Sequence, residues 1–173
     1  RILKVFKDIE KKIDTLFLMI YQAKKHFRYK DLEKDAEERL LEGFNKWKAG
    51  EWDKPFKIVG EAVSQLYQKI YSALKIPETL FEILGMAMSI KKGGGIQKSE
   101  LDISTVIRKI LTILTVYVYR NPENQDYLSQ KKFIILNYYK QEFINLSCDT
   151  LTLFSEMIRG NRYLQKLPSK YLY

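Results

Sequence analysis

A cluster of basic and aromatic residues near the first 30 positions could bind an anion. Phosphate groups are held by Lys and Arg, and nucleic-acid bases stack on aromatic rings. The same basic residues also suit the solvated C-terminal end of a helix, where positive charge complements the helix dipole. We favour the interpretation as a solvated helix end. The alternative interpretation is an anion- or partner-binding site. Its basic residues are Lys24, Lys25, Arg28 and Lys30, beside His26, Phe27 and Tyr29.

Six carboxylates between Asp31 and Glu42 could suggest metal binding or acid–base chemistry. They alternate with Lys34 and Arg39. Acidic and basic residues that alternate along a helix are typical of a solvated face with ion pairs between successive turns. We therefore predict no metal site here. The carboxylates are Asp31, Glu33, Asp35, Glu37, Glu38 and Glu42.

Three consecutive glycines, Gly93–Gly95, precede Lys98 and Ser99 and suggest a phosphate-binding loop. Such a loop needs a glycine directly before Lys-Ser and a strand before the glycines. Gln97 stands before Lys98, and a helical pattern precedes the loop. We predict a plain surface loop over 91–98.

Cys148 and His26 are the only cysteine and the only histidine. Neither a Cys/His zinc site nor an internal disulfide can form from them. We expect Cys148 to be a core or partly buried residue, and an intracellular setting. No set of titratable residues converges in the sequence, so we predict no catalytic residue, no cofactor and no enzyme.

The net charge of +9 is distributed along the whole chain. Residues 1–50 carry a net charge of +4, residues 51–100 of +1 and residues 101–173 of +4. An even spread does not form the basic stripe expected of a nucleic-acid-binding domain, so nucleic acid is an unlikely partner. The longest apolar-looking stretch, Ile110–Tyr119, is too short to cross a bilayer.

Apolar residues recur at helical spacing along most of the chain, which predicts an all-α protein. Ser99 with Asp102 three residues later suggests a capping box. A strand over 112–119 is the alternative for the β-branched region. Asn121-Pro122 suits a helix start, and Gly160-Asn161 a helix stop. The expected helices cover about 2–26, 30–48, 55–74, 77–88, 99–119, 122–130, 131–139 and 145–159, with another beginning at Pro168.

A repeat is suggested by three prolines, each of which follows an expected helix. Pro122 lies 45 residues after Pro77, and Pro168 lies 46 residues after Pro122. Armadillo and HEAT units have periods of about 40–47 residues. We therefore predict one domain over 1–173, an armadillo/HEAT-like helical solenoid segment of about seven to nine helices.

The sequence resembles the homology region shared by ryanodine receptors and inositol trisphosphate receptors, which are intracellular calcium-release channels. The resemblance covers 66–173 and leaves the N-terminal helices of 1–65 unmatched. Its residues are Leu66–Leu74, Ile76–Leu84, Asn121-Pro122-Glu123-Asn124-Gln125 and Arg159-Gly160-Asn161-Arg162-Tyr163-Leu164-Gln165.

This resemblance implies an armadillo-like regulatory segment on the cytoplasmic side of a tetrameric channel in a calcium-store membrane such as the endoplasmic reticulum. Such segments transmit conformational change to a distant pore and do no chemistry. No ligand-binding residue is carried over. Asn121 would cap a helix, and Asn124 and Gln125 would bind backbone groups at a turn between helices.

Two alternatives remain open beside the channel segment. One is a free-standing helical-repeat adaptor that binds other proteins. The other is a basic helical domain that binds nucleic acid.

Overall fold

A computed structural model of the chain describes residues 2–21, 45, 63–92, 97–131, 144–162 and 165. Six α-helices and no strand occur among them, which confirms the all-α class. The expected seven to nine helices referred to the whole chain. The helices are α1 (Ile2–Tyr21), α4 (Gln65–Ala73), α5 (Ile76–Lys92), α6 (Gln97–Val118), α7 (Pro122–Ser129) and α9 (Ile144–Ile158).

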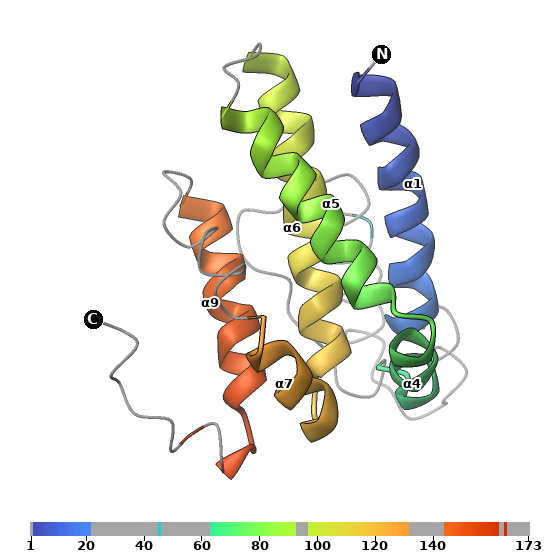
Figure 1. The fold of residues 1–173 in the computed structure, drawn as a ribbon, viewed down its shortest axis with the longest axis vertical. Helices are drawn as coiled ribbons and strands as arrows, with labels where there is room; N and C mark the ends of the chain where they lie inside the picture. The colour runs from blue at the N-terminus through green and yellow to red at the C-terminus, as the bar shows by residue number, and fades with distance from the viewer. Residues whose placement is uncertain are drawn as a thin grey trace.

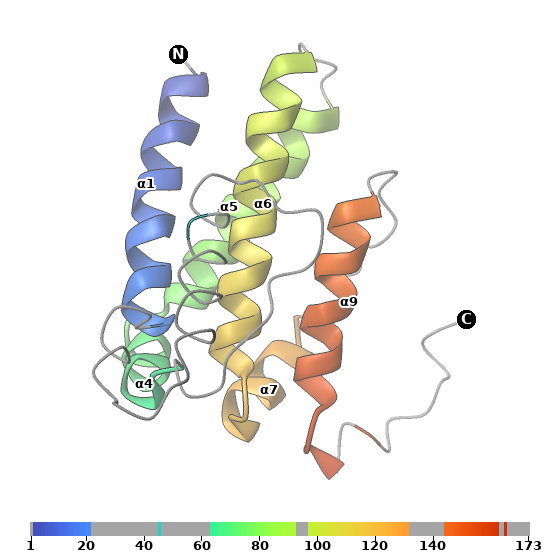
Figure 2. The same cartoon turned by 180° about the vertical axis from the view of Figure 1, so that it is seen from behind.

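Three long helices, α1, α6 and α9, lie side by side and run in the same direction, with α6 in the middle (Figures 1 and 2). Helix α5 packs on α6 and runs in the opposite direction (Figure 1). The short helices α4 and α7 lie at the C-terminal ends of the long ones. Helix α6 therefore has a long helix on either side and a third across its face.

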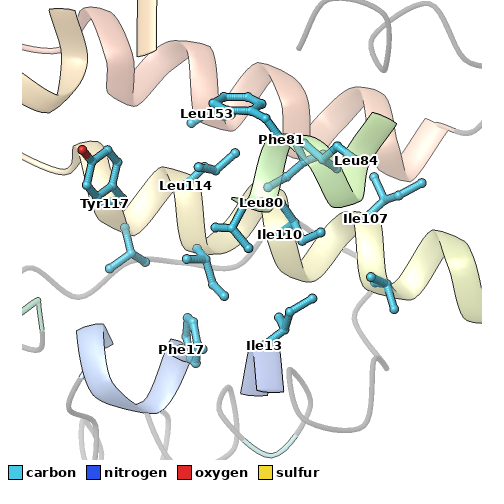
Figure 3. Packing of buried hydrophobic residues seen from close by; sticks show 14 of the residues in the cluster. Ile13, Phe17, Leu80, Phe81, Leu84, Ile107, Ile110, Leu114, Tyr117 and Leu153 are labelled. Carbon is cyan, nitrogen blue, oxygen red and sulfur yellow. The ribbon is translucent and has the colours of Figure 1, made fainter. Parts of the chain in front are cut away.

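This central position explains why α6 is apolar almost all round. A helix without a polar face is stable in water only when neighbours cover it. Residues from Val106 to Val118 are all buried. Figure 3 shows side chains of α6, such as Ile107, Ile110 and Leu114, meeting Ile13 of α1 and Leu153 of α9. The strand alternative for 112–119 is wrong because tertiary burial, not sheet pairing, selects these β-branched residues.

Several expected boundaries shift in the structure. Val63 and Ser64 lie outside any helix, and Ser64 caps α4 in an extended conformation, so the helix expected over 55–74 does not run through this point. Ser99 lies inside α6, which begins at Gln97, so the capping box is wrong. Helix α5 continues to Lys92, which shortens the expected 91–98 loop. In α5 and α6, regular backbone hydrogen bonding extends the helix beyond its side-chain signals.

The proline repeat stays a prediction, because Pro168 lies outside the described residues. Pro77 is near the start of α5 and follows the nine-residue α4, whereas Pro122 begins α7 and follows the 22-residue α6. Each of the two prolines lies in the first turn of its helix, two residues after a residue in the left-handed conformation, Lys75 with φ 55° and Arg120 with φ 49°. The helix expected to begin at Pro168 lies outside the described residues. Of the expected 30–48 helix the structure describes Asn45, which is helical, and of the expected 131–139 helix it describes Lys131.

Candidate functional site

The structure describes one of the two groups of predicted site residues. Asn121, Asn124 and Gln125 lie together where α6 meets α7, and their contacts are described below. Cys148 is partly buried on α9, as expected. The basic cluster Lys24, Lys25, Arg28 and Lys30, with His26, lies outside the described residues.

Gln68 of α4 holds the C-terminal end of α6. Its buried amide nitrogen donates to the carbonyl oxygens of Val116 at 2.9 Å and Tyr119 at 3.0 Å. The last carbonyls of a helix have no partner within the helix, so an outside donor must satisfy them when they are buried. Gln68 Oε1 accepts from Asn121 Nδ2 at 3.2 Å. One side chain therefore joins α4, the end of α6 and the start of α7.

Asn121 and Asn124 complete this first junction. Asn121 is the N-cap of α7, and its side-chain oxygen accepts from the Asn124 amide at 3.2 Å. Asn124 Nδ2 donates to the Tyr117 carbonyl at 2.8 Å, and its Oδ1 accepts from the Ser72 hydroxyl at 3.1 Å. The Ser72 hydroxyl also lies 2.7 Å from Tyr117 Oη. The roles expected for Asn121 and Asn124 match these contacts.

Gln125 makes the corresponding contacts at the end of α9. Its amide nitrogen donates to the carbonyls of Glu156 at 2.9 Å and Arg159 at 3.1 Å. Beside it, Asn161 Nδ2 donates to Asp126 Oδ1 at 2.9 Å. This second junction ties α7 to the last turn of α9, which is the backbone role expected for Gln125.

The two junctions share one geometry. In each, a glutamine amide bridges two carbonyls that are three residues apart, and the glutamine lies four residues after a helix N-cap, as in Ser64/Gln68 and Asn121/Gln125. In both cases the two carbonyls lie at the end of a helix that comes later in the chain, α6 for Gln68 and α9 for Gln125.

The chain turn before the cap is repeated as well. Arg120 precedes Asn121 with φ 49°, and Gly160 precedes Asn161 with φ 73°. A left-handed residue of this kind commonly ends a helix. Asn161 lies 40 residues after Asn121, and Gln165 lies 40 residues after Gln125. At both places, therefore, a helix ends in a left-handed residue, an asparagine follows directly, and a glutamine lies four residues later.

Ion pairs connect α6 to both long neighbours. Lys109 Nζ lies 2.7 Å from Glu10 Oε1 and 2.9 Å from Asp14 Oδ1, both on α1. Arg108 Nε lies 2.7 Å from Asp149 Oδ2 on α9. Consecutive residues on a helix point about 100° apart, so adjacent basic residues reach opposite neighbours.

Burial shifts the pKa of several groups near the junctions. Burial raises the pKa of the Glu156 carboxyl, and the nearby Arg159 and Arg120 lower it by less. Burial and the neighbouring Glu78 raise the pKa of Tyr127 to about 12. Burial likewise raises the pKa of Tyr117. In each of these groups, burial disfavours the ionised form.

No three His, Cys, Asp or Glu residues among the described ones are placed to hold a metal ion. None of the described helices combines the length and the apolar character needed to span a bilayer.

Sequence reasoning missed Gln68, Ser72 and the Arg108–Lys109 pair. A glutamine four residues after a cap, at both Ser64 and Asn121, was a visible signal for Gln68. No local signal showed that Arg108 and Lys109 would be buried, because their partners are distant in sequence.

Comparison with known proteins adds no name to this geometry. Protein-family models, curated proteins and solved structures were each compared with the chain, and none matches it.

Proposed function

We propose that the chain is a non-enzymatic, armadillo-like helical scaffold that passes movement between stacked helices within a larger assembly. The observation that carries this proposal is the repeated glutamine junction. Each junction uses a buried amide to fix the end of a long helix to a short one. Stacked helical units of this kind contact mainly their neighbours, so displacement of one unit is passed to the next.

A path for such movement follows from the contacts. Displacing α9 carries α7 with it, because Gln125 joins α7 to the last turn of α9. Three residues separate the end of α6 from the start of α7, and Asn124 binds the Tyr117 carbonyl. Gln68 then connects the same helix end to α4. Packed elements joined by short polar contacts move together more readily than they deform.

The proposal extends to the cytoplasmic region of an intracellular calcium-release channel. The sequence resemblance supports this extension, since two of its segments, Asn121–Gln125 and Arg159–Gln165, supply the equivalent parts of successive units. In such a channel the chain would relay a change at a ligand site toward the pore. Its partners would be other domains of the same subunit or neighbouring subunits.

This proposal makes the chain a segment of a longer protein, which is called the parent below. Calcium release from membrane vesicles tests the proposal in the intact parent. Vesicles that contain the parent are loaded with calcium and stimulated with inositol trisphosphate or, separately, with a calcium pulse. We expect release from vesicles with the parent and none from vesicles without it. Gln125→Met should shift the half-maximal stimulus by about fivefold or more, the lower range of allosteric coupling.

Gln130→Met is the matched control, because Gln130 is exposed at the end of the same helix. It should leave the response unchanged at equal protein amount. If the parent releases no calcium, the channel assignment fails, and an adaptor scaffold replaces it. If release occurs but Gln125→Met responds as the wild type does, the junction does not transmit movement.

A further inference from the structure

We propose that the outer face of α9 is an interaction surface for the long helix of a further helical unit, which lies parallel to α9 and ends near Gln165. The inference rests on the stacked units of the proposed function, but it does not depend on calcium release. Four residues define this α9 outer face: Cys148, Leu151, Ser155 and Ile158.

The hydrogen bonds of the caps align the three long helices residue by residue. Ser64 N donates to the Ile20 carbonyl at 2.8 Å, Asn121 N to the Val118 carbonyl at 3.1 Å, and Asn161 N to the Ile158 carbonyl at 3.3 Å. Ile20, Val118 and Ile158 therefore hold the same place in α1, α6 and α9. Counting seven residues back gives the equivalent positions Ile13, Leu111 and Leu151.

Helix α6 shows what covers this face when a neighbour is present. Arg108 directs one face of α6 toward α9 through its ion pair with Asp149. Positions three, seven and ten residues after Arg108 share that face. They are Leu111, Thr115 and Val118, all of which are buried, and Leu111 and Val118 are 0% exposed.

The same positions on α9 are open. With the 40-residue offset, Leu111 corresponds to Leu151 and Val118 to Ile158. Leu151 is 52% exposed and Ile158 is 46% exposed. The residue type is apolar at both places in both helices, and what differs is the neighbouring helix. Two large aliphatic side chains two turns apart on one face are the anchors expected of a helix that packs on another.

The opposite end of the stack is different. Among the side chains of α1 whose burial the structure describes, 4–21, the exposed ones are mostly polar, and the large apolar ones among them are Val5 and Met19. Terminal units of helical stacks carry a polar outer face, whereas internal units are apolar on both sides. The contrast favours a new helical unit on α9 over a second copy attached through α1. The polar exposed residues of α1 are Lys4, Lys7, Asp8, Lys11, Lys12 and Thr15.

Gln165 indicates where the incoming helix ends. Gln68 on α4 binds the last carbonyls of α6, and Gln125 on α7 binds the last carbonyls of α9. Gln165 lies four residues after Asn161, as Gln125 does after Asn121, and its backbone N–H donates to the Asn161 carbonyl at 3.0 Å. Its side chain is exposed and donates to the Ile158 carbonyl of the preceding helix at 2.9 Å. In a continued stack, the side-chain amide of Gln165 binds the last carbonyls of the incoming helix.

Site-specific crosslinking in the intact parent tests the surface. A photo-reactive phenylalanine analogue is placed at Leu151 or at Ile158, and the crosslinked peptides are identified by mass spectrometry. We expect both positions to crosslink to one helical segment. The two points of attachment should lie about seven residues apart in ascending order, because parallel helices keep the same direction. The same analogue at Leu66, which is exposed on α4, is the control.

Three results would overturn the proposal. The first is crosslinking at Leu151 and Ile158 no stronger than at Leu66. The second is attachment to 148–158 of another copy, which indicates a symmetric dimer through α9. The third is descending order or scattered points, which excludes a parallel helix.

A substitution on the surface gives an independent reading. Leu151→Asp with Ile158→Asp should abolish crosslinking from an analogue at Ser155, whereas Leu66→Asp with Leu74→Asp should not. Melting of the 173-residue chain should change little in either variant, because all four side chains are about half exposed or more. Undiminished crosslinking in the first variant contradicts the proposal. Crosslinking without calcium release would retain the surface and remove only the channel assignment.

Discussion

Helix α6 is joined to its two long neighbours by ion pairs that differ in burial. Toward α1, Lys109 is 0% exposed, but its partners Glu10 and Asp14 have side chains 29% and 20% exposed. Toward α9, both Arg108 and Asp149 are buried. The α1 contact thus has one end near water, and the α9 contact has none.

The two ion pairs depend on their partners to different degrees. A charge that can reach water recovers part of its hydration when its partner is lost, whereas a fully buried charge cannot. We therefore expect the α6–α9 contact to fail more abruptly than the α6–α1 contact. The following changes test this comparison.

Asp149→Ala should have the largest effect. It removes the Asp149 carboxylate that pairs with the buried Arg108 guanidinium, and breaking a buried ion pair costs about 3–5 kcal/mol of unfolding free energy. Urea denaturation measures the loss. The double variant Arg108→Met with Asp149→Leu should recover most of it, because an apolar pair of similar volume needs no compensation. A loss below about 1 kcal/mol for the single variant would show that the pair is not buried as the structure indicates.

Gln68→Met and Gln125→Met compare the two junctions themselves. Gln68 donates two hydrogen bonds and accepts one from Asn121, whereas Gln125 donates two. At about 1 kcal/mol for each hydrogen bond, we expect losses of about 2–3 and about 1–2 kcal/mol respectively. Methionine has a similar length, which limits any cavity. Thermal melting gives the order, and a greater loss for Gln125→Met would reverse our ranking.

Lys109→Met should cost less than Asp149→Ala, about 1–2 kcal/mol. The methionine keeps the packing of the lysine stem, and Glu10 and Asp14 can turn to water because both are partly exposed. Urea denaturation of this variant and of Asp149→Ala compares their losses of unfolding free energy directly. Equal losses would mean that burial of the partner does not set the cost.

Glu156→Gln should have the smallest effect, and it should stabilise. Burial raises the pKa of Glu156 above its ordinary value of 4.5, so the folded protein favours the neutral carboxyl. Its contribution to stability is present below pH 4.5 and is lost as the pH rises through the raised pKa. The always neutral glutamine should be more stable than the wild type at pH 7, and the difference should shrink toward pH 4. Urea denaturation across this range measures it, and a glutamine variant less stable at pH 7 would contradict the sign.

The Asn121 turn shows how much of a site can be predicted from sequence. Asn121 as a cap and Gly160-Asn161 as a stop follow from local chemistry, since a cap needs only its own side chain and the next amides. The capping box predicted at Ser99 is wrong, although it also rested on local chemistry. Its signal was local, but α6 extends two residues further because the backbone alone can continue a helix.

The sequence by itself determined the all-α class, the approximate places of α1, α5, α6, α7 and α9, and the N-cap at Asn121, because helical periodicity and capping act within one or two turns. Only the tertiary structure decided which glutamines cap which helix ends and that Lys109 pairs with α1 while Arg108 pairs with α9. These contacts join residues 31 to 99 positions apart. Their partners are chosen by how the helices pack, and no local pattern contains that information.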